Sequence, residues 1–322
     1  MILDIHADIF TDIFNKRING EEYIFKKYHL DKFRKGKVNG GIFVFWTKPG
    51  SKYDNYDSFK NMIRYARDEI ELGKNYISIA KNYKDYIDSI NSNKITAMMN
   101  LEGLSVLEGN LNYVEEIYDY GIRFSSLTWN EENAFACGAK VKNDVGLKRK
   151  GKDYIKLAQD LGIIIDVSHA SDKTFYDIYN NTKKPIIASH SNSRQLCNVA
   201  RNLDDEQIKL IKDTGGIIGI NAYRDFISED KNKQDVKNLI NHIDHIVNLI
   251  GIDSICFGFD FCDYIENDVQ DNIYERNNFT KGLEDSSRAS NILTELKNRG
   301  YTSEDIEKLS YKNFLKFLKR NF

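Results

Sequence analysis

The chain has 322 residues, of which 41% are hydrophobic and 29% are charged, and its formal net charge is −2. This is the composition of a globular protein, and so small a charge predicts neither nucleic acid nor a membrane as its partner. The length suits one α/β barrel, and the chain has only two prolines and no Gly/Ser-rich stretch that could form a linker. We therefore expect a single domain over residues 1–322.

The cysteines give an expectation for the cellular location of the protein. The four cysteines form no C-x-x-C pair, which in a chain of this length indicates reduced thiols and a cytoplasmic location. The N-terminus enters an apolar strand at once, without the features of a signal peptide, and no run of about 18 apolar residues could cross a membrane. The sequence leaves a homodimer open.

Short apolar runs alternate with helical patterns along the whole chain. The predicted strands are Ile2–Asp8, Gly41–Trp46, Ile95–Leu101, Ile122–Trp129, Ile163–Val167, Pro185–Ser189, Gly216–Asn221 and Ser254–Phe259. The predicted helices span 59–80, 114–118, 154–161, 172–179, 204–215 and 236–250, and two more follow Ser286. Several of the strands are apolar throughout, which is typical of a parallel sheet covered on both faces. We predict a (β/α)8 TIM-type barrel with additional C-terminal helices; an open doubly wound sheet is the alternative, but no G-x-G-x-x-G follows the first strand.

Residues with metal-binding side chains follow five of these strands. They are His6, Asp8, Glu102, His169, His190 and Asp260. In such a barrel the carboxyl ends of all strands meet at one mouth, so these side chains are expected to converge there. The chain has six histidines, and half of them are at these ends. The others, His29, His242 and His245, lie away from strand ends, and we interpret them as structural.

Three imidazoles and several carboxylates suit a divalent transition metal, zinc first. They also suit two ions, because one carboxylate can bridge metals about 3.5–4 Å apart, as in two-metal hydrolases. Glu102 is the expected bridge, and Gly103 beside it favours a tight turn.

These stretches resemble the membrane dipeptidase (renal dipeptidase) family of zinc peptidases. The matching motifs are D-I-H-A-D (4–8), N-L-E-G (100–103), D-V-S-H (166–169), A-S-H-S-N (188–192), A-R-N (200–202), H-I-D-H-I (242–246) and G-F-D-F (258–261). The resemblance implies two zinc ions, one on His6, Asp8 and Glu102 and the other on Glu102, His169 and His190. It further implies that Asp260 is the acidic group near the attacking water, and that Arg201 and Tyr223 hold the substrate's C-terminal carboxylate.

The chain departs from the family pattern at three places. Leu104 replaces the second Gly of Glu-Gly-Gly, and of a Gly-Gly-Asn near the C-terminus only Asn313 is kept. Trp129 stands where the best-known members carry a His thought to stabilise the oxyanion. An indole N–H can donate a hydrogen bond but carries no charge, so we interpret Trp129 as a wall of the substrate pocket. Asn130 or Asn133 could supply the missing donor.

The expected function is that of a dinuclear zinc dipeptidase, with Asp260 moving the proton and a D-residue tolerated at the substrate's C-terminal position. One alternative is another amidohydrolase-type enzyme, a deacetylase or lactonase; these commonly carry His-x-His after the first strand, where this chain has His6-Ala7-Asp8. The other is a metal-binding homologue with weak or lost catalysis, which Trp129 motivates.

Overall fold

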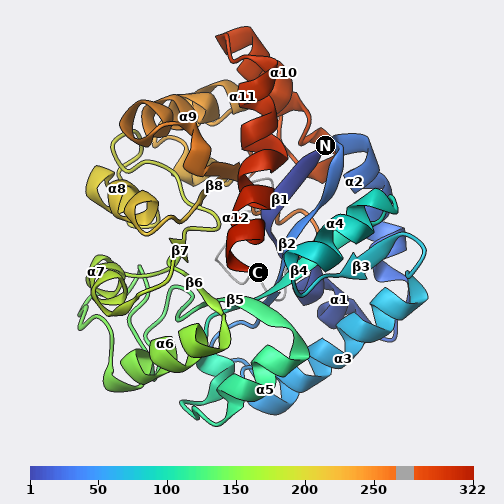
Figure 1. The fold of residues 1–322 in the computed structure, drawn as a ribbon, viewed down its shortest axis with the longest axis vertical. Helices are drawn as coiled ribbons and strands as arrows, with labels where there is room; N and C mark the ends of the chain where they lie inside the picture. Colours follow the sequence, from blue (N-terminus) through green and yellow to red (C-terminus); the bar gives the residue numbers. More distant parts are fainter. Residues whose placement is uncertain (266–278) are drawn as a thin grey trace.

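The computed structural model describes residues 1–265 and 279–322, and its centre is a parallel sheet that closes into a barrel (Figure 1). Within these residues eight strands follow the order β7-β6-β5-β4-β2-β1-β9-β8. Their bounds are β1 Ile2–Ala7, β2 Val38–Trp46, β4 Ile95–Glu102, β5 Ile122–Ser126, β6 Ile164–Asp166, β7 Ile186–Ile187, β8 Ile218–Ile220 and β9 Ile255–Phe257. The ring closes beyond β7, where Ala188 N–H donates to Ile217 O at 3.0 Å and Gly219 N–H donates to Ala188 O at 2.8 Å. The predicted TIM-type barrel is confirmed.

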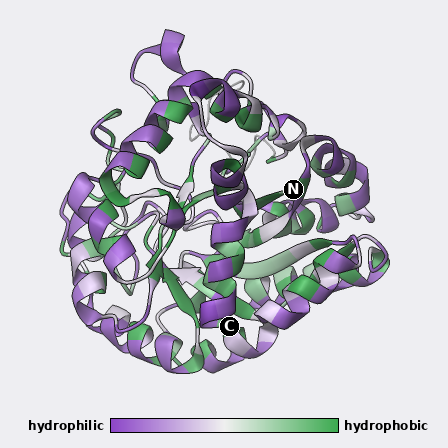
Figure 2. Cartoon of the chain, turned by 45° about the horizontal axis from the view of Figure 1, so that its top comes forward, coloured by the Kyte–Doolittle hydropathy of each residue, from purple (hydrophilic) through white to green (hydrophobic). Residues whose placement is uncertain are grey.

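The described α-helices pack around the barrel and across one of its ends (Figure 1). They are α1 Ile9–Arg17, α2 Leu30–Gly36, α3 Tyr56–Leu72, α4 Tyr83–Asn91, α5 Tyr113–Tyr120, α6 Arg149–Leu161, α7 Asp172–Asn181, α8 Asp205–Asp213, α9 Val236–Ile250, α10 Asn291–Arg299, α11 Ser303–Glu307 and α12 Asn313–Asn321. Figure 2 shows the central strands mainly in hydrophobic green, whereas the helices alternate green with hydrophilic purple. This alternation is the amphipathic pattern of helices that bury one side against a sheet. None of the described helices is long and apolar enough to cross a membrane.

The last helix covers the end of the barrel where the strands begin. Phe314, Phe317 and Leu318 of α12 are buried in one cluster with inward-facing residues such as Leu3 and Ile5 of β1. In Figure 1 this helix crosses the centre of the ring. Asn313, the residue kept from the family motif, donates to the carbonyls of Ile252 and Ile255, both at 2.8 Å, and so ties α12 to the start of β9. The opposite end, where the strands finish, is left for the functional site.

Two glycines allow the backbone to pack closely where the barrel closes. A Cβ at Gly219 would lie 1.9 Å from Ser189 O, and a Cβ at Gly258 would lie 1.7 Å from the same oxygen. No side chain fits at such distances, so the close approach of three strand ends around Ser189 requires glycine at both positions.

Four local predictions were wrong or incomplete. The helix predicted over 59–80 ends at Leu72, and Ile77–Ile79 form a further strand, β3, that pairs with β4. Strand β5 ends at Ser126, so Trp129 lies in the following loop. Helices α1, α2 and α4 were not predicted. The two terminal helices are present as α10 and as one continuous helical run from Ser303, which passes through a π-helical turn before α12.

Candidate metal centre

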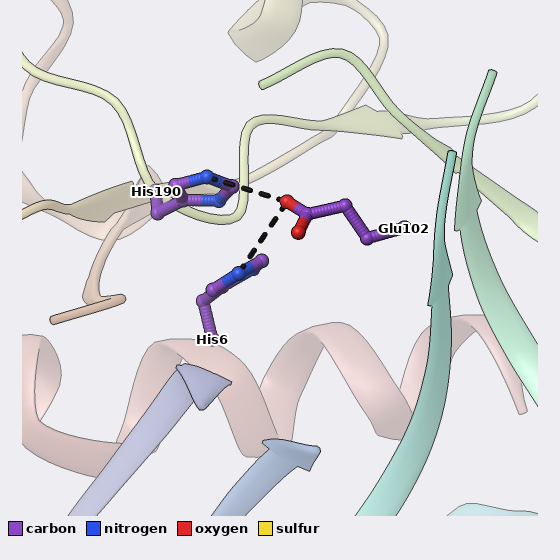
Figure 3. A group of neighbouring side chains, drawn as sticks. All are labelled: His6, Glu102 and His190. Atoms are coloured by element: carbon purple, nitrogen blue, oxygen red, sulfur yellow. Dashed lines mark ion pairs between the residues drawn. The ribbon is translucent and has the colours of Figure 1, made fainter. Parts of the chain in front are cut away.

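Glu102 lies at the barrel mouth close to three histidines, of which His6 and His190 are drawn with it in Figure 3. Its Oε1 atom lies 3.0 Å from His169 Nε2, 3.5 Å from His6 Nε2 and 3.6 Å from His190 Nε2. The four residues come from the ends of β1, β4, β6 and β7, and all are buried. The structure thus brings these four predicted site residues together.

Two carboxylates extend the cluster on the side of β1. Potential ligand atoms of His6, Asp8 and Asp260 lie within 4.8 Å of one another, as do those of His6, Glu102 and His190. His6 belongs to both groups, so the two groups are continuous. Asp8 follows β1 and Asp260 follows β9, which is the neighbour of β1 in the sheet. Pairing of these strands therefore explains why residues from the two ends of the chain meet.

Hydrogen bonds on the far side of each imidazole fix which nitrogen carries the proton. The Ser189 hydroxyl donates to Asp166 and can therefore only accept from the Nδ1 atoms of His6, at 2.9 Å, and His190, at 2.8 Å. The Nδ1 atom of His169 lies 3.1 Å from the amide oxygen of Asn130, which also only accepts. All three rings are thus protonated on Nδ1 and turn an Nε2 lone pair toward Glu102, as in metal-bound histidines.

Sequence reasoning did not single out this supporting network. Asp166 and Ser189 lie within motifs that were noticed for their histidines, but neither was assigned a role. Asp166 also accepts from the backbone N–H groups of Ser168 and Ser189, both at 3.0 Å. A buried carboxylate with several donors is a signal in the structure that residue spacing alone does not show.

Burial dominates the electrostatics of the cluster. It lowers the pKa of His6 to about 3, with the charge of Arg201 as a smaller cause. It also lowers the pKa values of His169 and His190 below their usual range. Burial, followed by repulsion from Asp8, raises the pKa of Glu102 well above its usual range. Desolvation therefore favours neutral imidazoles, which can bind a metal, and disfavours charged carboxylates unless a cation neutralises them.

A cation fits this arrangement. The buried atoms His6 Nε2 and Glu102 Oε1 have no hydrogen-bond partner among the described residues. The Nε2 atoms of His169 and His190 lie 2.9 Å apart with a lone pair on each. Acceptor atoms crowded together are costly in a protein interior when some of them, here His6 Nε2 and Glu102 Oε1, lack a donor, and a divalent cation would satisfy them together.

Arg201 enters the cluster from the loop after β7. Its Nη2 atom donates to His190 Nε2 at 2.9 Å and reaches His169 Nε2 at 3.3 Å. The guanidinium carbon also lies 5.4 Å from the centroid of the Phe226 ring. The ring centroids of Phe226 and Tyr223 are 4.8 Å apart. Arg201 therefore brings a positive charge to the His169 and His190 side of the mouth, and the half-buried Tyr223 lies behind it.

Asp260 is held in an unusual backbone conformation. Its φ angle is +59°, in the left-handed region that residues other than glycine seldom adopt. Asn221, at the end of β8, donates to Asp260 Oδ2 at 3.2 Å. Burial raises the pKa of Asp260 to about 7, while Arg201 and the Asn221 hydrogen bond act in the other direction. A carboxyl group with a pKa near neutrality is suited to both accepting and releasing a proton.

Trp129 lies at the rim of the cluster. Its ring centroid is 5.9 Å from that of His169 and 5.2 Å from that of Trp46, and the side chain is half-buried.

Gly103 has φ +80°, and a Cβ there would approach Trp129 N to 3.2 Å, so the turn after Glu102 requires this glycine. Leu104 has an ordinary negative φ of −97°, which explains why a second glycine is dispensable.

The other polar residues considered from sequence have partners outside the cluster. The side-chain amide of Asn133 donates to Leu127 O at 2.8 Å, so it is engaged within its own loop. His29 pairs with Asp12 and His245 with Asp205, both at 2.7 Å. His242 accepts from Ser193 N–H and lies 2.9 Å from Ile227 O. These contacts agree with the structural role expected for the three histidines.

Comparison with known proteins identifies the family. Residues 1–321 match the family model described as membrane dipeptidase (peptidase family M19). The chain belongs to this family. It is 28% identical over 308 residues to an uncharacterized dipeptidase of Schizosaccharomyces pombe, covering 90% of this chain and 71% of the relative. It is also 28% identical over 305 residues to dipeptidase tcpJ of Claviceps purpurea, covering 90% of this chain and 69% of that protein.

Solved structures agree with this family assignment at the level of the fold. A metallopeptidase from Rhodobacter sphaeroides, solved with a phosphinate mimic of the dipeptide L-Ala-D-Ala, superposes with a TM-score of 0.87 at 18% identity. The match covers 100% of this chain and 99% of that one. As an M19 family member, the chain is a metal-dependent dipeptidase. The buried His/Glu cluster at its barrel mouth is the candidate metal site.

Proposed function

We propose that the chain hydrolyses dipeptides with two zinc ions, held by His6, Asp8 and Glu102 and by Glu102, His169 and His190. The observation that carries this proposal is the set of three Nε2 lone pairs turned toward Glu102 Oε1, with Asp8 and Asp260 beside them. The central position of Glu102 supports its role as the shared ligand. The cytoplasmic location and the single-domain organisation stay predictions.

The chain's own residues divide the remaining work of the reaction. Bound zinc supplies a Lewis acid for the scissile carbonyl and lowers the pKa of water. Asp260 accepts the proton of the attacking water and passes it to the leaving amine, a role that its position beside His6 and Asp8 supports. Asn221 donates to Asp260 Oδ2 and so helps to hold the orientation of this carboxylate. The buried walls exclude bulk water and strengthen each of these interactions.

Arg201 is suited to holding the substrate's C-terminal carboxylate. A guanidinium donates parallel hydrogen bonds to a carboxylate, and a buried one also supplies charge that water does not screen. Binding the terminal carboxylate this close to the metal ligands would restrict cleavage to very short peptides. The L-Ala-D-Ala mimic bound by the Rhodobacter sphaeroides relative supports acceptance of a D-residue at the C-terminal position.

The family match favours the dipeptidase over a deacetylase or lactonase. The proposal is tested with a panel of dipeptides and their C-terminal amides, assayed with added zinc. Arg201→Ala should raise KM for free dipeptides with a loss of about 1.5–3 kcal/mol, typical of a charge-assisted hydrogen bond. Amides should be cleaved about equally poorly by both proteins.

The matched control is Arg64→Ala, which removes an exposed arginine of α3 and should leave both substrate series unchanged. Equal losses on free and amidated dipeptides in Arg201→Ala would contradict the proposed role of Arg201. No turnover of any dipeptide by the zinc-loaded wild type would contradict the proposed activity itself and favour a homologue that has lost catalysis.

A further inference from the structure

One hydroxyl group, that of Ser189, contacts a histidine of each proposed metal site. Its Oγ atom lies 2.9 Å from His6 Nδ1 and 2.8 Å from His190 Nδ1. His6 is the proposed ligand of one zinc ion, and His190 is the proposed ligand of the other. Because both imidazoles point to the same oxygen, their ring centroids lie only 3.6 Å apart. The orientation of one ligand in each site therefore depends on a single atom.

The hydrogen-bonding capacity of this hydroxyl is fully used. A serine hydroxyl has one proton to donate and two lone pairs that accept. Ser189 donates its proton to Asp166, and the two imidazole N–H groups donate to its lone pairs. Two backbone N–H groups, those of Ser168 and Ser189, donate to Asp166 Oδ1 at 3.0 Å and so orient this carboxylate. One carboxylate thus acts on two histidines through one oxygen.

Loss of the Ser189 oxygen would leave the two imidazoles with a different acceptor. Their Nδ1 atoms have no other hydrogen-bond partner among the described residues, and a buried N–H without an acceptor is costly. Glu102 Oε1, which lacks a hydrogen-bond partner in the same part of the chain, lies 3.5 Å from His6 Nε2 and 3.6 Å from His190 Nε2. Without Ser189 Oγ the Nε2–H tautomer is therefore favoured, because it can donate to Glu102. An imidazole in that form has no Nε2 lone pair for a metal.

The third imidazole of the cluster has an acceptor of its own. His169 Nδ1 lies 3.1 Å from Asn130 Oδ1. In the described part of the chain, Asn130 is hydrogen-bonded to neither His6 nor His190. The cluster therefore contains one shared acceptor and one separate acceptor, and each can be removed without the other.

We propose that Ser189 is a positioning residue that couples the two metal sites by fixing the tautomer of one ligand in each. The inference rests on the proposed two-zinc dipeptidase and deepens it, because it places both sites under the control of one hydroxyl. Asp166 contributes by taking the serine proton, which leaves both lone pairs for the imidazoles. Removal of this hydroxyl should therefore weaken both sites together, although Ser189 is not itself a ligand.

The first test reads the tautomers in the metal-free protein at neutral pH. NMR chemical shifts of the ring nitrogens distinguish a protonated atom from an unprotonated one. The wild type should show Nδ1–H at His6, His169 and His190. Ser189→Ala should move His6 and His190 toward Nε2–H and leave His169 unchanged, whereas Asn130→Ala should change His169 alone.

The second test measures zinc binding by calorimetry in the presence of a competing chelator. Ser189→Ala should weaken the binding of both ions, each by about 10–100-fold, the range found for groups that orient metal-bound histidines. Asn130→Ala should weaken one ion by a similar factor. Ser168→Ala is the matched control, because its buried hydroxyl lies 3.3 Å from Ser189 Oγ and is hydrogen-bonded to no imidazole among the described residues. It should leave both zinc affinities and all three tautomers unchanged.

The two measurements separate this inference from the proposed function. Unchanged tautomers in Ser189→Ala, or weakened binding of a single ion, would overturn the coupling and leave the dipeptidase intact. A wild type that cleaves no dipeptide would overturn the function. The coupling would still stand in that case if Ser189→Ala changed both tautomers and both zinc affinities.

Asp166→Asn keeps the test available if thermal melts show that Ser189→Ala does not fold. The amide oxygen would keep the two backbone N–H groups, so the amide nitrogen would donate to Ser189 Oγ and occupy one of its lone pairs. Only one of His6 and His190 should then remain protonated on Nδ1. If both imidazoles kept Nδ1–H in this variant, the proposed role of Ser189 would be wrong.

Discussion

Trp129 lies beside the candidate metal centre, because its ring contacts the ring of His169 on one hand and that of Trp46 on the other. This position agrees with a wall that limits substrate shape. We therefore expect Trp129→His to broaden the range of dipeptides cleaved and to lower kcat/KM on the best substrate, since the smaller ring leaves space beside His169. Kinetics on a dipeptide panel, with thermal melts as control, measure the change. A uniform rise in kcat without any change in selectivity would instead show that a catalytic donor had been missing.

His242 gives the fold a pH dependence that is separate from the metal centre. Burial lowers its pKa from 6.5 to about 4, with His245 as a further cause. Between these values the unfolded chain binds a proton that the folded chain does not, so stability is complete above pH 6.5 and falls as the pH approaches 4. The loss is about 3 kcal/mol, because one pKa unit corresponds to about 1.4 kcal/mol.

His242→Gln should remove this part of the pH dependence, at some cost in stability at neutral pH, since glutamine does not titrate. Urea unfolding of both proteins between pH 7 and pH 4 measures the difference. Parallel stability curves for the two proteins would show that another group causes the acid sensitivity.

At the same scale, sequence predicted the side chains that converge but not those that orient them. His6, Glu102, His169 and His190 could be found because each follows a strand and parallel strands end at one mouth. Ser189 and Asn221 could not be assigned, because their effect depends on which atoms they face across the barrel. Asn130 was considered as an oxyanion donor, whereas its amide oxygen accepts from His169.

Helix α12 contributes to stability by filling the barrel end where the strands begin. Phe317 is 2% exposed and belongs to the cluster that includes the inward-facing residues of the strands. Phe317→Ala should destabilise the protein by about 3–5 kcal/mol, because it leaves a cavity in a core that cannot collapse freely. Chemical denaturation measures the loss, and Lys316→Ala on the exposed side of the same helix should change stability by no more than about 0.5 kcal/mol. Similar small effects for both variants would mean that α12 packs loosely.

Elements were predictable from sequence where one pattern excluded the others. Helix α9 was predicted with its observed bounds because its apolar stripe runs for four turns, and the predicted capping box of Asp204 and Gln207 is present at α8. Strand β3 was assigned to a helix because Tyr76, Ile77 and Ala80 continue the spacing of α3, although Gly73 already ends that helix. Helix α1 follows β1 after one residue, and the strand signal concealed its start.

Metal binding should stabilise the fold of the whole molecule. The candidate ligands come from strands that are far apart in sequence, so a bound ion would join both halves of the barrel. Removing metal with a chelator should lower the melting temperature, and restoring zinc in thousandfold excess over its Kd should recover about 4 kcal/mol. Elemental analysis should give two zinc ions per chain. A content that never exceeds one, even after zinc addition, would contradict the two-metal proposal.

Substitution of Glu102, the proposed shared ligand, tests the two-metal proposal more directly than the metal content of the wild type. Glu102→Gln should weaken both sites together, because it removes a charge that both ions would use. Glu115→Gln, at an exposed position of α5, is the control and should keep the full metal content. Loss of only one ion in Glu102→Gln would show that Glu102 serves a single site.

The left-handed backbone conformation of Asp260 lowers the stability of the fold at a residue that the proposed reaction needs. A non-glycine residue in that region costs on the order of 1 kcal/mol or more, and burying its carboxyl group beside Asp8 adds to the cost. Glycine at this position would relieve both costs and would also remove the proposed proton acceptor. A laboratory selection for heat resistance alone, applied to the metal-free chain, would therefore favour variants that survive heating and no longer turn over substrate. A search for thermostable variants of this enzyme therefore has to measure turnover in each round of selection.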